Sequence, residues 1–137
     1  MPHDPEFVAE TRSWLVKADG DLRAADVLRN TRPPLLDDAL YHCQQSAEKA
    51  LKGFLAWHGR TFRKTHNLSE LGQSAIEIAP DLAEVLRRAA GLTAYAWRFR
   101  YPGEPEAPTR EEADRALATA REVLAAILAR LPEEVRP

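Results

Sequence analysis

The chain has a single cysteine, few glycines and no long apolar stretch. Because Cys43 stands alone among 137 residues, no internal disulfide is available, which fits a reducing, cytoplasmic setting. No apolar run approaches the roughly 18 residues that a membrane-spanning helix needs. The first residues, MPHDPEF, are acidic and contain proline, unlike a secretory signal peptide. We therefore expect one domain in the cytoplasm.

Signatures of common catalytic and metal sites are also missing. The sequence has no Gly-rich phosphate loop, no G-x-S-x-G elbow and no H-E-x-x-H motif. His42, His58 and His66 lack the i, i+4 spacing of metal ligands, and no cysteine cluster accompanies them. The sequence therefore predicts no metal site, no cofactor and no catalytic residue of these kinds.

Charge is unevenly distributed along the chain. The formal net charge is −2, but residues 58–100 hold seven basic and four acidic side chains, a local excess of +3. Such a cationic zone is compatible with a phosphate-bearing ligand. It is too small to indicate a nucleic-acid binder, since a solvated face has the same bias.

Helical spacing dominates the sequence, and no stretch alternates apolar and polar residues with period two. Apolar residues recur at helical intervals in five segments, and the fold class they predict is all-α. We expect a mainly antiparallel, up-and-down bundle of four long helices plus one short helix, with frayed ends at 1–5 and 132–137. The expected helices cover 6–30, 36–57, 67–78 (the short one), 81–99 and 109–131.

Local signals mark where these helices begin and end. Pro33 and Pro34 end the first helix, since proline cannot continue the hydrogen-bond ladder, and Gly59 supplies the left-handed stop of the second. Gly91 costs its helix about 1 kcal/mol relative to alanine, which is tolerable where two backbones approach closely. Three pairs have the spacing of a capping box: Asn67 with Glu70, Asp81 with Glu84, and Thr109 with Glu112.

Residues 41–57, YHCQQSAEKALKGFLAW, form the stretch on which packing and chemistry converge. Gln44 falls inside the apolar arc of this helix, so we predict that it is buried and bonded to Glu48 or Arg100. Beside the arc lies a polar stripe, which consists of Tyr41, Gln45, Glu48 and Lys52. Two interpretations stay open: a core helix with a solvated edge, or a helix that lines a cleft or a partner through Gln44 and Glu48.

A second polar cluster lies near the end of the fourth expected helix. Residues 97–101, WRFRY, alternate aromatic and cationic side chains, as surfaces that bind single-stranded nucleic acid do. The same short pattern also occurs at a helix end where the arginines pair with neighbouring carboxylates. This pattern alone does not separate the two.

Three segments together carry a family resemblance. YHCQQSAEKALKGFL, then KTHNLSEL after a short loop, then AYAWRFRYPG, followed by an amphipathic last helix, resemble the HEPN domain family. The match is most similar to the stand-alone prokaryotic branch related to the C-terminal domain of the chaperone sacsin. It covers residues 6–131, which we expect to form a single helical domain.

The resemblance implies several properties. HEPN proteins are usually homodimers encoded beside a minimal nucleotidyltransferase, and some are proposed to bind nucleotides. Other branches are metal-independent endoribonucleases with a late R-x4-6-H motif. Here no histidine follows Arg98 or Arg100, and Arg60 with His66 has the spacing in the wrong loop. The resemblance therefore favours a protein that is not an enzyme.

The sequence leads to one principal interpretation and two alternatives. We expect a non-catalytic, dimeric nucleotide- or phosphate-binding partner of a minimal nucleotidyltransferase. The alternatives are a metal-independent endoribonuclease toxin of a toxin–antitoxin pair, which would bind RNA, and a purely structural dimerisation module. The expected ligand-binding residues are Gln44, Glu48, Lys49, Lys52, Arg98 and Arg100.

Overall fold

The computed structural model describes residues 3–104 and 106–137, and over these ranges it contains helices and loops but no strand. The all-α prediction is confirmed. The short helix is α3, and α4 continues into a 3₁₀ helix, η2, to make the fourth long segment. The elements are α1 (Pro5–Arg29), α2 (Leu36–Trp57), α3 (Leu68–Ile78), η1 (Pro80–Leu82), α4 (Ala83–Ala89), η2 (Ala90–Ala96), α5 (Arg110–Leu128) and η3 (Glu133–Val135).

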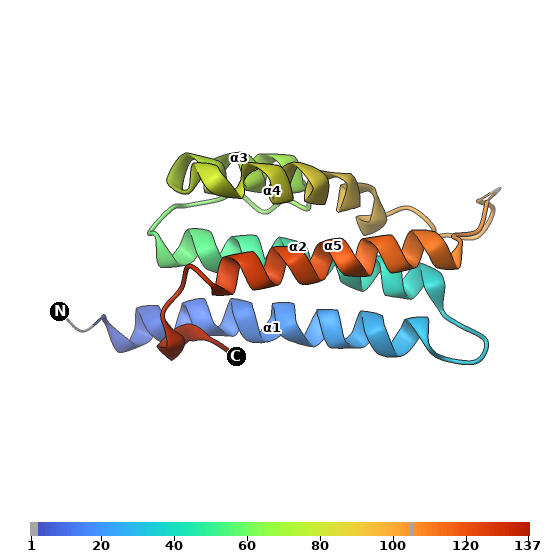
Figure 1. The fold of residues 1–137 in the computed structure, drawn as a ribbon, viewed down its shortest axis with the longest axis horizontal. Helices are drawn as coiled ribbons and strands as arrows, with labels where there is room; N and C mark the ends of the chain where they lie inside the picture. Colours follow the sequence, from blue (N-terminus) through green and yellow to red (C-terminus); the bar gives the residue numbers. More distant parts are fainter. Residues whose placement is uncertain (1–2, 105) are drawn as a thin grey trace.

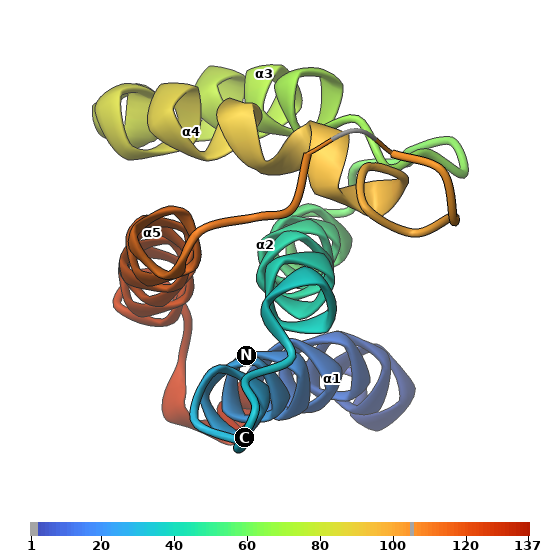
Figure 2. The same ribbon diagram turned by 90° about the vertical axis from the view of Figure 1, so that its right-hand side faces the viewer.

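The helices lie in three layers (Figures 1 and 2). α1 forms one outer layer, α2 and α5 lie beside each other in the middle, and α3 with α4 covers the opposite side. α2 and α5 run in the same direction, antiparallel to α1, because the α3–α4 pair returns the chain to the end at which α2 began. No helix in residues 3–104 or 106–137 is long and apolar enough to cross a membrane.

Two of the three predicted helix starts are confirmed. The Asn67 side chain accepts hydrogen bonds from the backbone N–H groups of Ser69 (2.9 Å) and Glu70 (3.2 Å) at the start of α3. The Thr109 hydroxyl accepts one from the N–H of Glu112 (3.1 Å) at the start of α5. These bonds satisfy N–H groups that have no partner inside the helix.

The predicted start at Asp81 is wrong. Pro80 begins a 3₁₀ turn, so Asp81 lies inside that turn, and α4 begins two residues later without a side-chain cap. The Asp81 carboxylate pairs instead with Arg130 near the end of α5. The helical segment also ends at Ala96 rather than Phe99, and its second half is 3₁₀ rather than α.

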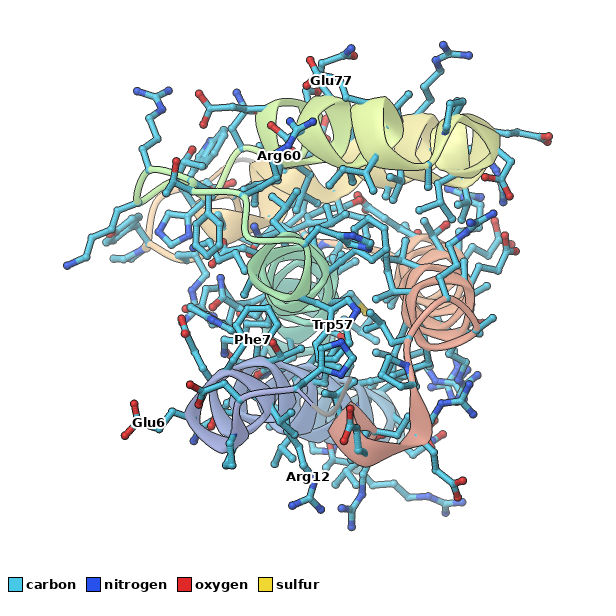
Figure 3. The ribbon with its side chains drawn as sticks, turned by 90° about the vertical axis from the view of Figure 1, so that its left-hand side faces the viewer. Glu6, Phe7, Arg12, Trp57, Arg60 and Glu77 are labelled. Carbon is cyan, nitrogen blue, oxygen red and sulfur yellow. The ribbon has the colours of Figure 1, made fainter. Side chains whose placement is uncertain are left out.

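The two segments expected to be frayed contact the helices within the described residues. Residues 1 and 2 lie outside the described range. Asp4 caps α1 by accepting from the N–H of Glu6 (2.8 Å), and the ring of His3 lies 4.3 Å from that of Trp57. Phe7 stacks on the same indole at 5.3 Å, which Figure 3 shows at the start of α1. Aromatic packing orders this segment.

The C-terminal segment also packs on α1. In η3 the side chain of Val135 is fully buried, and Arg12 Nε donates to the carbonyl oxygen of Arg136 at 3.1 Å. Burial of this apolar side chain and the bond to α1 hold residues that sequence composition alone marks as frayed.

The close approach of backbones that the sequence suggested at Gly91 is found at Gly53 instead. A Cβ added to Gly91 would meet no atom within 4 Å. A Cβ added to Gly53 would lie 3.0 Å from Leu15 Cδ2 and 3.1 Å from Trp14 Cβ, so α1 packs tightly against α2 at this glycine.

Candidate functional site

A buried polar network runs along α2 toward the loop before α3. Gln44 is fully buried, and its Nε2 donates to Glu48 Oε1 at 3.2 Å and to the carbonyl oxygen of His66 at 3.1 Å. Its own Oε1 accepts from Gln45 Nε2 at 2.7 Å. The prediction that Gln44 is buried and bonded to Glu48 is confirmed, whereas Arg100 bonds elsewhere.

The Glu48 carboxylate is the centre of this network. His66 Nδ1 lies 2.6 Å from Oε1, and Lys52 Nζ donates to Oε2 at 3.0 Å. The ammonium of Lys52 lies 5.7 Å from the centre of the Trp14 ring and 5.9 Å from that of Phe62. Such cation–π contacts gain strength where water is excluded.

The interpretation of the stripe as a solvated edge is wrong for three of its four residues. Gln45, Glu48 and Lys52 are only 7%, 4% and 7% exposed. Trp14 of α1 and Phe62 of the following loop lie against Lys52, and His66 lies against Glu48. A buried charge pair is stable only when its other hydrogen-bonding groups also have partners. Gln44 and His66 are these partners for the Glu48 carboxylate. The positive charge of Lys52 is thus neutralised inside the protein.

Lys49 belongs to a separate contact on the α1 side of α2. Its Nζ lies 2.5 Å from Asp21 Oδ2, and the other carboxylate oxygen lies 2.8 Å from Nδ1 of His42. Ser46 donates to the carbonyl oxygen of Ala18 at 2.8 Å on the same face. These bonds fix α2 against α1. No sequence pattern indicated Asp21, which is 28 residues from Lys49.

Arg98 and Arg100 lie in a third place, beyond the end of η2. Arg100 donates to Asp38 at 2.9 Å, and its guanidinium lies 4.1 Å from the centre of the Tyr41 ring. Arg98 is held more loosely, 3.7 Å from Glu112 and 3.8 Å from Glu106. The six predicted ligand-binding residues therefore do not form one pocket.

The backbone at Phe99 separates the two arginines. Phe99 has φ of 66°, in the left-handed region that bulky residues rarely adopt. Its ring is buried, and its N–H donates to Glu104 Oε1 at 2.8 Å. This reversal directs Arg98 toward α5 and Arg100 toward α2. Two exposed aromatic side chains flank them, Trp97 (56% exposed) and Tyr101 (72% exposed).

Two titratable groups away from these clusters have shifted pKa values. Burial raises the pKa of the Cys43 thiol to about 12, which opposes a nucleophilic role. Partial burial, with a smaller contribution from Arg60, lowers the pKa of His58. In the described part of the chain, no three His, Cys, Asp or Glu residues come together as a metal ion would require.

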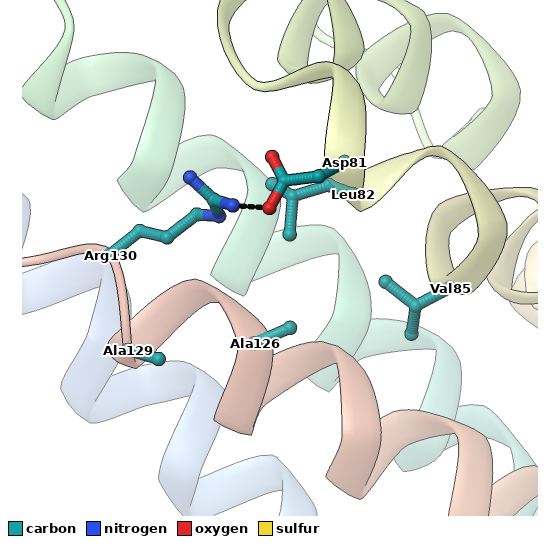
Figure 4. Close-up of a pocket in the computed structure, with 6 residues that line it drawn as sticks. All are labelled: Asp81, Leu82, Val85, Ala126, Ala129 and Arg130. Atoms are coloured by element: carbon teal, nitrogen blue, oxygen red, sulfur yellow. Dashed lines mark ion pairs between the residues drawn. The ribbon is translucent and has the colours of Figure 1, made fainter.

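A hollow of about 590 Å³ lies between the start of α4 and the end of α5. Its apolar lining includes Leu82, Val85 and Ala126, and the ion pair of Asp81 with Arg130 crosses it (Figure 4). Since its two charged groups neutralise each other, this hollow does not attract an ion of either sign.

The HEPN domain model matches residues 11–131. The chain belongs to the HEPN family. A solved relative, the crystal structure of TT1696 from Thermus thermophilus, is 30% identical and superposes with a TM-score of 0.72. The alignment covers 88% of this HEPN chain and 98% of that protein. No curated protein matches this HEPN chain.

Proposed function

We propose that this HEPN protein is a non-catalytic, dimeric nucleotide- or phosphate-binding protein that acts as the partner of a minimal nucleotidyltransferase. The observation that carries the binding role is the alternation of two partly exposed arginines, Arg98 and Arg100, with the exposed rings of Trp97 and Tyr101. The partner enzyme follows from the family resemblance.

The arginines can exchange their present partners for a ligand. Their side chains are 43% and 31% exposed, and ion pairs at such positions contribute only about 0–1 kcal/mol. A phosphate offers a guanidinium two parallel hydrogen bonds, which are stronger than a single loose contact. The rings of Trp97 and Tyr101 present apolar faces on which a base can stack.

The α2 residues then have a supporting role. Gln44, Glu48 and Lys52 bond to one another in the interior, and Lys49 bonds to Asp21. Exposing any of them to a ligand would break a buried bond, which costs about 1–3 kcal/mol or more. Of the six predicted residues, Arg98 and Arg100 are therefore the ones available for contact with the ligand.

Calorimetric titration with ATP and GTP at low salt tests the binding role. We expect dissociation constants between micromolar and millimolar, and about tenfold weaker binding for Arg100→Ala, the loss of one charged hydrogen bond. Arg23→Ala removes an exposed charge from α1 and serves as the control. Absence of heat at millimolar nucleotide would instead favour the structural dimerisation module.

Two further measurements test the assembly. Light scattering should give twice the chain mass of 15.4 kDa at micromolar concentration. The motivation is the apolar surface left on one chain, which includes Val16, Val27 and Leu35. A pull-down from the native host should recover a nucleotidyltransferase. A monomer in solution would contradict the dimer whatever the ligand result.

A further inference from the structure

A groove of about 340 Å³ lies between the α4–η2 segment and α5. A polar bridge lies at each end of it. At one end Arg88 pairs with Glu122 at 2.7 Å, and at the other the Tyr95 hydroxyl donates to Glu112 at 2.6 Å. The eight residues from 88 to 95 span seven steps, which make the groove roughly 10–14 Å long from the rise per residue of α and 3₁₀ helices.

The space between the two bridges exists because the facing side chains are small. A Cβ on Gly91 would meet no atom within 4 Å, so this helix position leaves the groove empty. On α5 the facing residues include Ala116, whose methyl group is buried, and Thr119, whose hydroxyl can bond a ligand. Leu92 supplies an apolar floor.

The charges around the groove favour an anion. Arg115 lines it, is exposed, and has no carboxylate within 4.0 Å in the part of the chain that the structure describes. Arg88 lies in an exposed ion pair, whose side chains are 49% and 50% accessible, and such pairs exchange readily. Arg98 stands at the far end, 3.7 Å from Glu112.

Two carboxylates oppose an anion: that of Glu122, which pairs with Arg88, and that of Glu112, which lines the groove. The Glu112 carboxylate already accepts from the Tyr95 hydroxyl and lies beside Arg98. Burial first, and then the bond to Glu112, raise the pKa of Tyr95 well above its ordinary value, so the hydroxyl keeps its proton and its bond at neutral pH. Three guanidinium groups thus lie along the groove, and both carboxylates beside it already have partners.

We propose that this groove binds the phosphate chain of a nucleotide, with Arg115 as the principal contact and Arg88 and Arg98 at the two ends. The length suits several linked phosphates rather than one. For the nucleoside part of the ligand, the proposal rests on the proposed function. For the polyphosphate part, it rests on the groove itself.

The test uses two probes, inorganic tripolyphosphate and ATP, titrated at low salt into the full chain. Arg115→Ala should weaken both about tenfold, as the loss of a charged hydrogen bond does. Arg87→Ala, one residue along α4 from Arg88 but outside the groove lining, is the matched control and should change neither. Glu112→Gln, which removes one of the opposing charges, should tighten both.

A second variant tests the groove by its shape. Gly91→Gln places a neutral side chain in the empty space and should abolish tripolyphosphate binding. Because glutamine is a better helix former than glycine, the midpoint of thermal unfolding should not fall, which separates loss of binding from loss of fold.

The outcomes distinguish this proposal from the proposed function. If ATP binds and depends on Arg100 but not on Arg115 or Gly91, the groove is overturned and the nucleotide-binding role stands. If tripolyphosphate binds through Arg115 and ATP binds no tighter, the groove is confirmed and the nucleotide-binding role fails. If neither probe binds at millimolar concentration, both are overturned.

Discussion

The Glu48 carboxylate lies 2.6 Å from Nδ1 of His66, across the loop that joins α2 to α3. Glu48 is buried, whereas the His66 side chain is 63% exposed. The same carboxylate bonds Lys52 and Gln44. The Glu48 side chain therefore holds the loop against α2, pairs with the buried ammonium of Lys52 and accepts a hydrogen bond from the buried amide of Gln44.

Removing this carboxylate should be among the most damaging single changes in the chain. Glu48→Ala leaves the Lys52 ammonium without its partner in the interior, and breaking a buried pair in this way costs about 3–5 kcal/mol. Urea unfolding measures the loss. Glu70→Ala, which breaks the exposed pair with Arg63, is the control and should cost at most about 1 kcal/mol. Equal effects of the two substitutions would show that Glu48 is hydrated.

Gln44 is the neutral member of the same network. Gln44→Leu keeps an apolar fit in the arc but leaves the Gln45 amide and the His66 carbonyl without their bonds. Because these groups lie inside or at the edge of the interior, we expect a loss of about 1–3 kcal/mol by the same urea assay. A neutral outcome would mean that both groups reach water when the amide is gone.

The two helix glycines should respond in opposite directions to the same substitution. Gly53→Ala forces a methyl group against Leu15 and Trp14, and overpacking of this kind costs about 1–3 kcal/mol. Gly91→Ala meets open space and should stabilise the protein by about 0.5–1 kcal/mol through helix propensity. Chemical denaturation of the pair measures the difference. Stabilisation by both would show that α1 and α2 separate more easily than their contact indicates.

His58 should make stability depend on pH. Its pKa is lower in the folded protein than the ordinary value of about 6.5, so the unfolded chain binds the proton more readily. Stability is therefore lost as the pH falls below about 6.5 toward the folded pKa. Thermal unfolding at pH 7.5 and 5.5 should show a larger fall for the wild type than for His58→Gln. A parallel fall of both proteins would assign the pH dependence to other groups.

The isolated protein should not cleave RNA in the absence of metal. Cleavage needs a base for the 2′-hydroxyl and an acid for the leaving oxygen, and arginine, always protonated, cannot be the base. His42 lies against Asp21 and His66 against Glu48, while Arg98 and Arg100 pair with other carboxylates. Mixed-sequence RNA in EDTA is the assay, with His42→Ala and Arg100→Ala beside the parent. Cleavage that either substitution abolishes would establish the ribonuclease alternative.

Local features of this fold could be predicted from the sequence. Helical periodicity indicated the five segments, and the caps at Asn67 and Thr109 follow from side chains that bond backbone groups two or three residues away. The bond between Gln44 and Glu48 was predictable because residues four apart on a helix are neighbours. The family resemblance likewise rests on contiguous motifs, and the match to residues 11–131 confirmed it.

Features that depend on distant residues could not be predicted. Lys49 is bound by Asp21 and Arg100 by Asp38, from helix positions that carry no local signal of such a role. The burial of Lys52 depends on Trp14 and on Phe62 in the following loop, which hydrophobic periodicity does not position. The six expected ligand-binding residues were grouped because all are polar. They lie in three separate places because their partners are distant in sequence.

The burial of α2 on its polar as well as its apolar side has a consequence for motions of the native state. From Cys43 to Leu55 every residue of this helix except Lys49 is buried, and α1, α3, α5 and η2 all contact it. Opening the centre of α2 to solvent would thus require several of these elements to leave together, which amounts to global unfolding. Its central amide hydrogens, from Cys43 to Phe54, should exchange with deuterium at the rate set by complete unfolding, while those of α4 and η2 exchange through smaller openings.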